Sequence, residues 1–251
     1  MAILKKTGFI FVFSSMLFLA QLTLADSYSV GKEPKYDSYY EDTLLTYGVD
    51  ASPQSLTAAL LNKNVNVRAY AAIVIKQKGF KQLEKFLLDA FETEKQAATK
   101  IKMAATLVEF GSDVPSSYLR TTIENGSESS ESILASGLLL KSGDISGYPV
   151  IKKAITSPNQ MMRVEAVYQL AAYEKFQGRK IKDVEISVFD DFDYVLTKDN
   201  STFVKTEAAR ELSDTKSDEA MKVLQKHMND GDEKVRQAIS LYMNKMKAKS
   251  R

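Results

Sequence analysis

The pentapeptide Val235-Arg236-Gln237-Ala238-Ile239 and five related segments earlier in the chain decide the fold of this protein. The earlier segments are, in order, Val67-Arg68-Ala69-Tyr70-Ala71, Ile101-Lys102-Met103-Ala104-Ala105, Ile133-Leu134-Ala135-Ser136-Gly137, Met162-Arg163-Val164-Glu165-Ala166 and Val204-Lys205-Thr206-Glu207-Ala208. All six begin with an apolar residue, five continue with Arg or Lys, and five have Ala or Gly four residues after the apolar one. The segments lie 34, 32, 29, 42 and 31 residues apart. This pattern is typical of a tandem array whose units cannot bury their apolar faces alone and therefore stack.

Each unit is expected to be a pair of helices. Apolar residues recur at helical spacing, and no period-two alternation between Ser52 and Lys247 is long enough to indicate a sheet. Glycines that would end helices stand at positions 79, 111, 143 and 178, and prolines that would begin them stand at 53, 115, 149 and 158. The apolar residue and the small residue of each segment share a helix face, so the small residue allows a neighbouring helix to come close.

A polar turn precedes these segments. The best example is Asn229-Asp230-Gly231-Asp232-Glu233-Lys234-Val235-Arg236-Gln237-Ala238, in which Asp230 and Glu233 fit a capping box with Asp230 as the N-cap. The stretch Asn64–Ala72 follows the same pattern.

A polar turn followed by Val-Arg and then Ala resembles the HEAT-repeat superfamily, in particular its short phycobilisome-lyase-type HEAT-like repeats. The third unit departs from the family pattern, because Leu134 takes the basic place and Gly137 that of Ala. The resemblance implies an all-α, right-handed α-solenoid of the armadillo type, with about six antiparallel helix pairs whose second helices line a concave face. Such folds mostly serve binding.

The first 25 residues predict a secretory signal peptide. Lys5 and Lys6 precede an uncharged stretch of 17 residues, Gly8–Leu24, and Ala25 offers a small residue for cleavage. We therefore expect a secreted or periplasmic protein without a membrane span after cleavage. An uncleaved N-terminal membrane anchor is the alternative, although the stretch lies at the lower limit for spanning a bilayer.

Charge and composition narrow the function. The 251 residues include 34 Lys and Arg, 32 Asp and Glu, one His and no Cys. Without the two leader lysines the chain is neutral, which argues against a nucleic-acid partner. The absence of Cys excludes disulfides and thiolate chemistry, and a single His excludes a two-histidine site, so we expect no metal and no cofactor.

We divide the chain into the signal peptide 1–25, a Tyr-rich acidic cap 26–52, the repeat array 53–247 and a basic tail 248–251. The cap carries six acidic and two basic residues, and the last seven residues carry four basic ones, so the ends have opposite charges of −4 and +4. This asymmetry is compatible with weak head-to-tail self-association.

Two groups of residues are candidates for binding a partner. The first, which we call the basic series, supplies one cation per unit except the third and consists of Arg68, Lys102, Arg163, Lys205 and Arg236. These side chains form either a binding stripe or, as we favour, a ladder to the polar turn of the adjacent unit. The second group is Tyr36, Tyr39 and Tyr40, which either contact a partner or cover the core of the first unit.

Other motifs have less specific interpretations. His227 is expected to be a packed histidine at the edge of the core. The acidic runs Asp190–Asp193 and Asn229–Glu233 resemble calcium ligands but lack the required spacing. The long interval between the fourth and fifth units contains an insertion at Gly178–Ser187, either a lengthened solvated turn or a binding loop.

Taken together, these features predict a non-catalytic protein–protein interaction or scaffold module that binds a protein or peptide on its concave face. One alternative is a HEAT-like enzyme, either a lyase for chromophore ligation or a nucleic-acid base-excision enzyme. The other is a structural envelope assembly factor that uses its charged ends.

Overall fold

The computed structural model of the protein describes residues 38–125 and 129–249. The expected signal peptide 1–25 and Tyr36 lie outside the described residues, as do the side chains of the basic tail 248–251.

The described residues are mostly α-helical and form 13 α-helices, as the sequence predicts. The α-helices are α2 Tyr39–Thr46, α3 Pro53–Ala59, α4 Val65–Gln77, α5 Glu84–Thr93, α6 Ala97–Glu109, α7 Ser116–Glu124, α8 Ser130–Lys141, α9 Tyr148–Ala154, α10 Gln160–Leu170, α11 Val188–Lys198, α12 Thr202–Thr215, α13 Asp218–Lys226 and α14 Glu233–Lys249. The 3-10 helices are η1 Lys81–Leu83 and η2 Ala171–Phe176. The strands are β1 Lys180–Ile181 and β2 Val184–Glu185.

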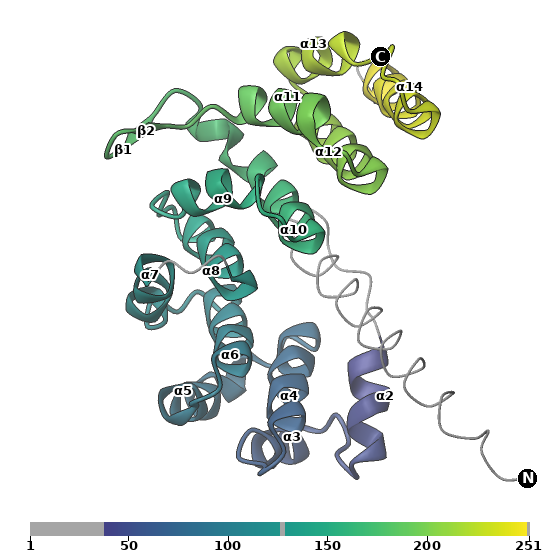
Figure 1. The fold of residues 1–251 in the computed structure, drawn as a ribbon. Helices are drawn as coiled ribbons and strands as arrows, with labels where there is room; N and C mark the ends of the chain where they lie inside the picture. The colour runs from purple at the N-terminus through teal and green to yellow at the C-terminus, as the bar shows by residue number, and fades with distance from the viewer. Residues whose placement is uncertain (1–37, 126–128, 250–251) are drawn as a thin grey trace, which may run out of the picture.

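The helices pack in sequential neighbour pairs along a curved path (Figure 1). We call α4, α6, α8, α10, α12 and α14 the inner helices, because they follow one another side by side along the inside of the curve (Figure 1). The outer helices α3, α5, α7, α9, α11 and α13 each precede an inner helix and pack against it, and α9 and α13 also contact the inner helix before them. We call each such pair a unit, which gives six units after α2.

Local sequence explains where the helices begin and end. The side chain of Ser52 caps α3 by accepting the backbone N–H of Ser55, and Pro53 takes the first helical position. Gly79 follows α4 and has a φ of +65°. A residue with a Cβ atom would be strained in this conformation.

The hydrophobic core consists of two clusters that meet in α8. Ile133 and Leu140 of this helix belong to the C-terminal cluster, whereas Ala135 and Leu139 belong to the N-terminal one. Gly137, also in α8, has the steric role expected of the small residue. A Cβ atom at this position would lie 2.1 Å from Oε1 of Gln169 in α10.

The insertion at Gly178–Ser187 corrects the expectation of no sheet. It forms a short antiparallel hairpin in which Lys180 faces Glu185 and Ile181 faces Val184 (Figure 1). With two residues in each strand, the hairpin is too short to produce a period-two pattern in the sequence. Lys182 makes the turn with φ of +53°.

The first helix of the described residues, α2, covers the first unit. Tyr40 and Leu44 are buried against α4, and the rings of Tyr40 and Tyr70 lie 5.4 Å apart. Ser38 precedes α2, but its side chain makes no capping hydrogen bond.

Candidate functional site: the ion-paired turns and the inner face

The turns before the inner helices share one hydrogen bond. A side-chain oxygen accepts the backbone N–H of the residue two positions later, which is the N-cap of the inner helix. For example, Asp199 accepts from Ser201 at 2.8 Å and Glu94 from Gln96 at 2.8 Å. The residues that accept this bond are Asn62, Glu94, Ser157, Asp199 and Asp230. The bond fixes the direction in which each turn presents its polar side chain.

Asp230 is therefore not the N-cap that the capping-box pattern predicts. The helix α14 begins at Glu233, directly after Asp232. Asp232 accepts the N–H of Lys234 at 2.8 Å, while Asp230 accepts that of Asp232 at 2.8 Å. Two acids of similar local preference compete for the cap here, and the turn geometry selects the second one.

Arg68 joins the first unit to the second. Its Nε and Nη2 donate to the two carboxylate oxygens of Glu94 at 2.6 and 3.0 Å. Its Nη1 donates to the carbonyl oxygens of Asn62 and Lys63 in its own turn at 2.8 and 3.2 Å. The planar guanidinium thus bonds two turns at once, an arrangement that a lysine ammonium cannot reproduce.

The same arrangement recurs in the C-terminal half. Arg163 donates to both oxygens of Asp199 at 2.7 and 3.1 Å and to the carbonyl oxygen of Ser157 at 2.9 Å. Lys205 lies 2.9 Å from Oδ2 of Asp230. We call Arg68–Glu94, Arg163–Asp199 and Lys205–Asp230 the ladder pairs. They confirm the predicted ladder for these three cations.

Arg236 occupies the same place in the last inner helix. Its Nη1 donates to the carbonyl oxygens of Asp230 and Gly231 at 2.6 and 3.1 Å, within its own turn. No further unit follows in the described residues, so the ladder ends here. The prediction that a partner binds the basic series stays a prediction, and the ladder contacts already use these cations inside the array.

Lys102 does not belong to the ladder. In α4, α10, α12 and α14 the ladder cation stands four residues after the N-cap, and in α6 that position is Lys100. Lys100 donates to the carbonyl oxygen of Glu94 at 3.3 Å, as Arg68 does to that of Asn62. The repeat pattern places the cation of this unit two residues too late, because Ile101-Lys102 matches the apolar-then-basic pattern and Thr99-Lys100 does not.

The ladder changes the acidity of its carboxylates. Burial raises the pKa of Glu94, but the hydrogen bonds from Arg68 and from the backbone N–H of Gln96 outweigh this and hold the pKa below its usual value. Asp230 also has a lowered pKa, because burial raises it but the hydrogen bonds from Lys205 and from the backbone N–H of Asp232, with the nearby positive charge, together lower it more. Both carboxylates are therefore charged at neutral pH and serve as fixed acceptors.

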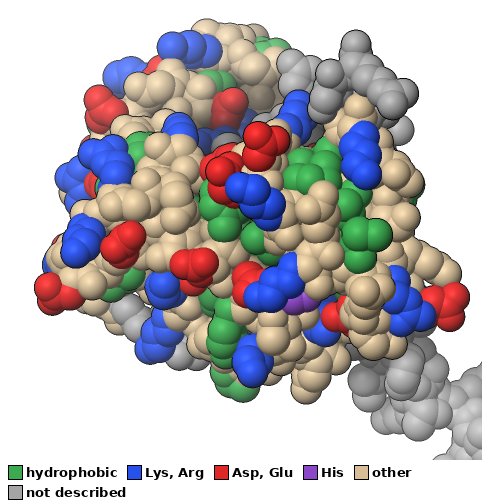
Figure 2. All heavy atoms as spheres, turned by 90° about the horizontal axis from the view of Figure 1, so that it is seen from above, with side chains coloured by type: hydrophobic (Ala, Val, Ile, Leu, Met, Phe, Trp, Pro, Cys, Tyr) green, Lys and Arg blue, Asp and Glu red, His purple; other side chains and the backbone are tan. Residues whose placement is uncertain are grey.

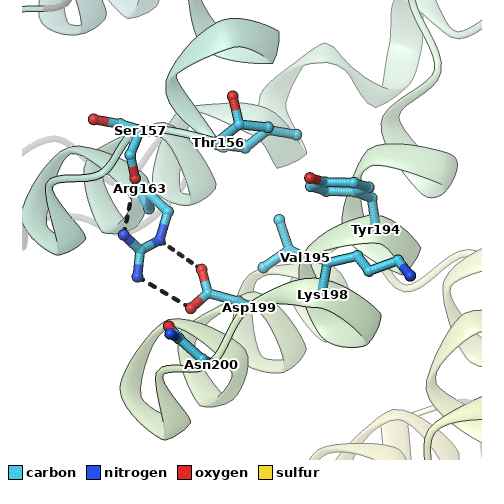
Figure 3. Close-up of a pocket in the computed structure, with 9 residues that line it drawn as sticks. Thr156, Ser157, Arg163, Tyr194, Val195, Lys198, Asp199 and Asn200 are labelled. Atoms are coloured by element: carbon cyan, nitrogen blue, oxygen red, sulfur yellow. Dashed lines mark hydrogen bonds and ion pairs between the residues drawn. The ribbon is translucent and has the colours of Figure 1, made fainter.

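Two equivalent hollows lie beside the ladder pairs. One, of about 210 Å³, is lined by Arg163 and Asp199 on one side and by Tyr194 and Thr156 on the other (Figure 3). The other, of about 450 Å³, lies at Arg68 and Glu94. Each hollow is open and lies where the turns of two adjacent units meet, so it can accept a side chain from a bound protein but not enclose a small molecule.

A charged and aromatic cluster lies between α10 and α12. Arg210 is 2.6 Å from the carboxylate of Glu207 and 2.8 Å from that of Glu211, and its guanidinium carbon lies 5.3 Å from the ring centroid of Tyr168. Sequence analysis did not single out this cluster, because its members come from two helices about 40 residues apart, which no local spacing connects.

The other residues that the sequence singles out make contacts within the fold or lie at its surface. His227 is buried, and its Nε2 lies 2.8 Å from Oδ1 of Asp193, which fits the expected packed histidine. Asp191 is buried and accepts a hydrogen bond from the hydroxyl of Tyr148. Tyr39, unlike Tyr40, is 40% exposed.

Within residues 38–125 and 129–249, no group of three or more His, Cys, Asp or Glu side chains is placed to hold a metal ion. Among the helices of this part of the chain, none combines the length and the apolar character needed to cross a membrane.

Comparison with known proteins gives no family assignment. The chain matches no protein-family model, and no curated protein sequence is significantly similar to it.

Proposed function

We propose that this protein is an exported, non-catalytic binding module: a right-handed, HEAT-like α-solenoid that holds a peptide or protein on its concave inner face. The HEAT-like assignment rests on the repeated turn, the ladder cation four residues after the N-cap and the helix pairs, since no sequence relative supports it.

The continuous inner face is the observation that carries the proposal. Six inner helices lie side by side, and residues two positions after their N-caps remain accessible to a partner. These residues are exposed in the first, second and last inner helices and half-buried in the others, and they are Asn66, Ala98, Glu131, Met161, Phe203 and Lys234. A partner that runs across the helices would meet one such side chain from each unit, which is how repeat arrays form extended binding surfaces.

The structural use of the polar groups favours binding over catalysis. The carboxylates of Glu94, Asp199 and Asp230 join adjacent units, and that of Asp191 holds Tyr148. A general acid or base needs a carboxylate that is free to exchange a proton, whereas Glu94 and Asp199, although they line the two hollows, have both oxygens bonded to an arginine. For this reason we rank the HEAT-like lyase or base-excision enzyme below the binding module.

Site-specific photocrosslinking tests the proposed face. A photoreactive amino acid replaces Ala98 or Phe203 on the inner helices and, as matched controls, Phe86 or Gln225 on the outer helices α5 and α13. All four variants are made in the full chain and irradiated in the expressing cell. We expect one crosslinked product of the same added mass from both inner positions and none from the outer ones. Products from the outer positions alone, or from no position, would contradict the proposal.

Export has its own test. The protein recovered from the extracytoplasmic fraction should begin at Asp26, because cleavage is expected after Ala25. An intact Met1 on exported protein would favour the uncleaved anchor, and protein confined to the cytoplasm would contradict export altogether.

A further inference from the structure

The N-terminal end of the helix array presents exposed hydrophobic side chains. On α2, Leu45 is 54% exposed, and Tyr47, directly after the helix, is 48% exposed, while Tyr40 and Leu44 of the same helix are buried. The helix therefore covers the first unit with one face and offers apolar surface on the other. Clustered exposed side chains of this size mark contact sites more often than isolated ones do.

This end is acidic. Residues 38–52 contain Glu41, Asp42 and Asp50 and no Lys or Arg, a charge of −3. Glu41 lies 2.8 Å from Nζ of Lys78, whereas Asp42 and Asp50 are exposed. A partner for this end should combine an apolar residue with positive charge.

The C-terminal end of the array has those properties. Nine residues after their N-caps, the inner helices α4, α6, α8 and α10 carry side chains that are 2–7% exposed, namely Ile73, Ala105, Leu138 and Tyr168. The equivalent residue of α14 is Leu241, which is 52% exposed, and no further inner helix follows α14 in the described residues. Residues 233–249 contain five basic residues and one acidic residue, a charge of +4. Figure 2, which views the molecule from the side of α13 and α14 in Figure 1, shows hydrophobic side chains among charged side chains of both signs.

We propose that the C-terminal end of one copy docks on the N-terminal end of a second copy, with Leu241 of α14 against Leu45 and Tyr47 of α2. Opposite charges of +4 and −3 select this pairing over contacts between identical ends, which would repel. The contact extends the row of inner helices from one molecule into the next. Because the two surfaces differ, the association is heterologous and produces chains of copies instead of a closed dimer.

The contact is expected to be weak and reversible. Gln237 and Asn244, on either side of Leu241 along the exposed face of α14, are polar and exposed, so one apolar residue and the charges supply the attraction. This inference concerns the ends of the array and is independent of the proposed partner on the inner face.

Sedimentation velocity of the purified protein tests the proposal. The full chain is expressed, its N-terminus is read by mass spectrometry, and the mean mass is followed with protein concentration at about 0.1 M and about 1 M salt, where the Debye length is about 10 Å and about 3 Å. We expect a mean mass that rises with concentration without reaching a plateau at the dimer, and a smaller rise at high salt.

Substitutions at both ends locate the contact. Leu45→Ser and Leu241→Ser should each weaken association about tenfold, whereas Phe86→Ser, at an equally exposed residue of α5, should leave it unchanged. Asp42→Lys and Lys245→Glu should each weaken it as well. A mixture of these two charge variants should regain association, because the Lys of one variant then meets the Glu of the other.

Each remaining outcome overturns the proposal. A protein that is monomeric at every concentration and salt has no such contact. Association that survives Leu45→Ser and Leu241→Ser uses another surface. A limiting dimer mass would indicate contact between identical ends.

Discussion

The third unit differs from the first and the fourth in the way it is joined to the unit that follows it. In the first and fourth units, Arg68 and Arg163 hold carboxylates of the following unit with two hydrogen bonds each. In the third unit, Ile133, and not Leu134 as the repeat pattern predicts, stands in the place of these arginines, four residues after the N-cap of α8. It packs in the core instead, so this unit offers no ladder cation to the fourth.

Close packing replaces the ladder around the third unit. The backbone of Gly147 approaches Ser136 of α8 so closely that a Cβ atom on Gly147 would lie 2.5 Å from that of Ser136. The hydroxyl of Tyr173 donates to the carbonyl oxygen of Ser136 at 3.2 Å. The two core clusters also meet in α8. The junctions held by ladder pairs should therefore be sensitive to charge and pH, and the junction between the third and fourth units to side-chain volume.

The largest effect should come from added volume in the middle. Gly147→Ala places a methyl group 2.6 Å from the Cα atom of Ser136, and a backbone atom cannot rotate away. We expect a loss of about 3 kcal/mol in the free energy of unfolding, measured by urea denaturation. Gly231→Ala is the control, because its Cβ atom would meet nothing within 4 Å, and it should change stability little. Equal stabilities of the two variants would show that close packing at Gly147 does not hold the third and fourth units together.

Breaking a ladder pair should cost somewhat less. Asp199→Asn removes the charge that Arg163 binds, where the two side chains are 3% and 13% exposed, and we expect a loss of about 2 kcal/mol. Asp89→Asn acts on the exposed pair with Lys85 and should cost less than about 0.5 kcal/mol. A double-mutant cycle of Asp199 with Arg163 measures the coupling energy between them. A coupling energy near zero would show that the ladder pair does not contribute to stability.

Two carboxylates, Glu94 of a ladder pair and Asp191 of α11 in the fifth unit, should make the stability depend on pH with opposite signs. The pKa of Glu94 is lowered in the folded protein, so its contribution is present above the usual Glu pKa and is lost as pH falls through the lowered value. Burial raises the pKa of Asp191 more than the bonds from Tyr148 and Lys152 lower it, so its folding contribution declines as pH rises from about 4 through the raised value.

Unfolding curves of two variants against pH check these signs. The stability advantage of the parent over Glu94→Gln should shrink on acidification below about pH 4.5. The parent should lose stability relative to Asp191→Asn as pH rises above about 4. Parallel curves for parent and variant would show that the carboxylate in question has the same pKa in the folded and unfolded chain.

The smallest effect on stability should come from Lys102, which the repeat pattern assigns to the ladder but the structure does not. Burial lowers the pKa of Lys102, and no ladder carboxylate contacts it, so Lys102→Met should change the free energy of unfolding by no more than about 0.5 kcal/mol. Arg68→Met, which leaves Glu94 buried without its guanidinium, should cost about 2 kcal/mol. Similar losses from both variants would restore Lys102 to the ladder.

Much of the fold could be predicted because its causes are local. Helical spacing of apolar residues, the capping Ser52 and the helix-ending Gly79 act within a few positions of the chain, and the structure has helices where they indicate. The hairpin at Lys180–Glu185 could not be predicted, because four strand residues are too few to show a periodic pattern. The choice of Lys100 over Lys102 as the cation of the second unit could not be predicted, because the N-cap of α6, Gln96, is not a typical capping residue.

The sequence by itself determined the repeating helical units, the cation that recurs in them and the excess of charge at each end, because composition, period and polar turns are properties of neighbouring residues. Only the tertiary structure decided which carboxylate each cation binds, that Arg210 meets Tyr168, and that Leu241 lies exposed where the equivalent residues are packed. These features depend on contacts between residues about 25 or more positions apart, which local sequence does not specify. They follow from how each unit packs against the next.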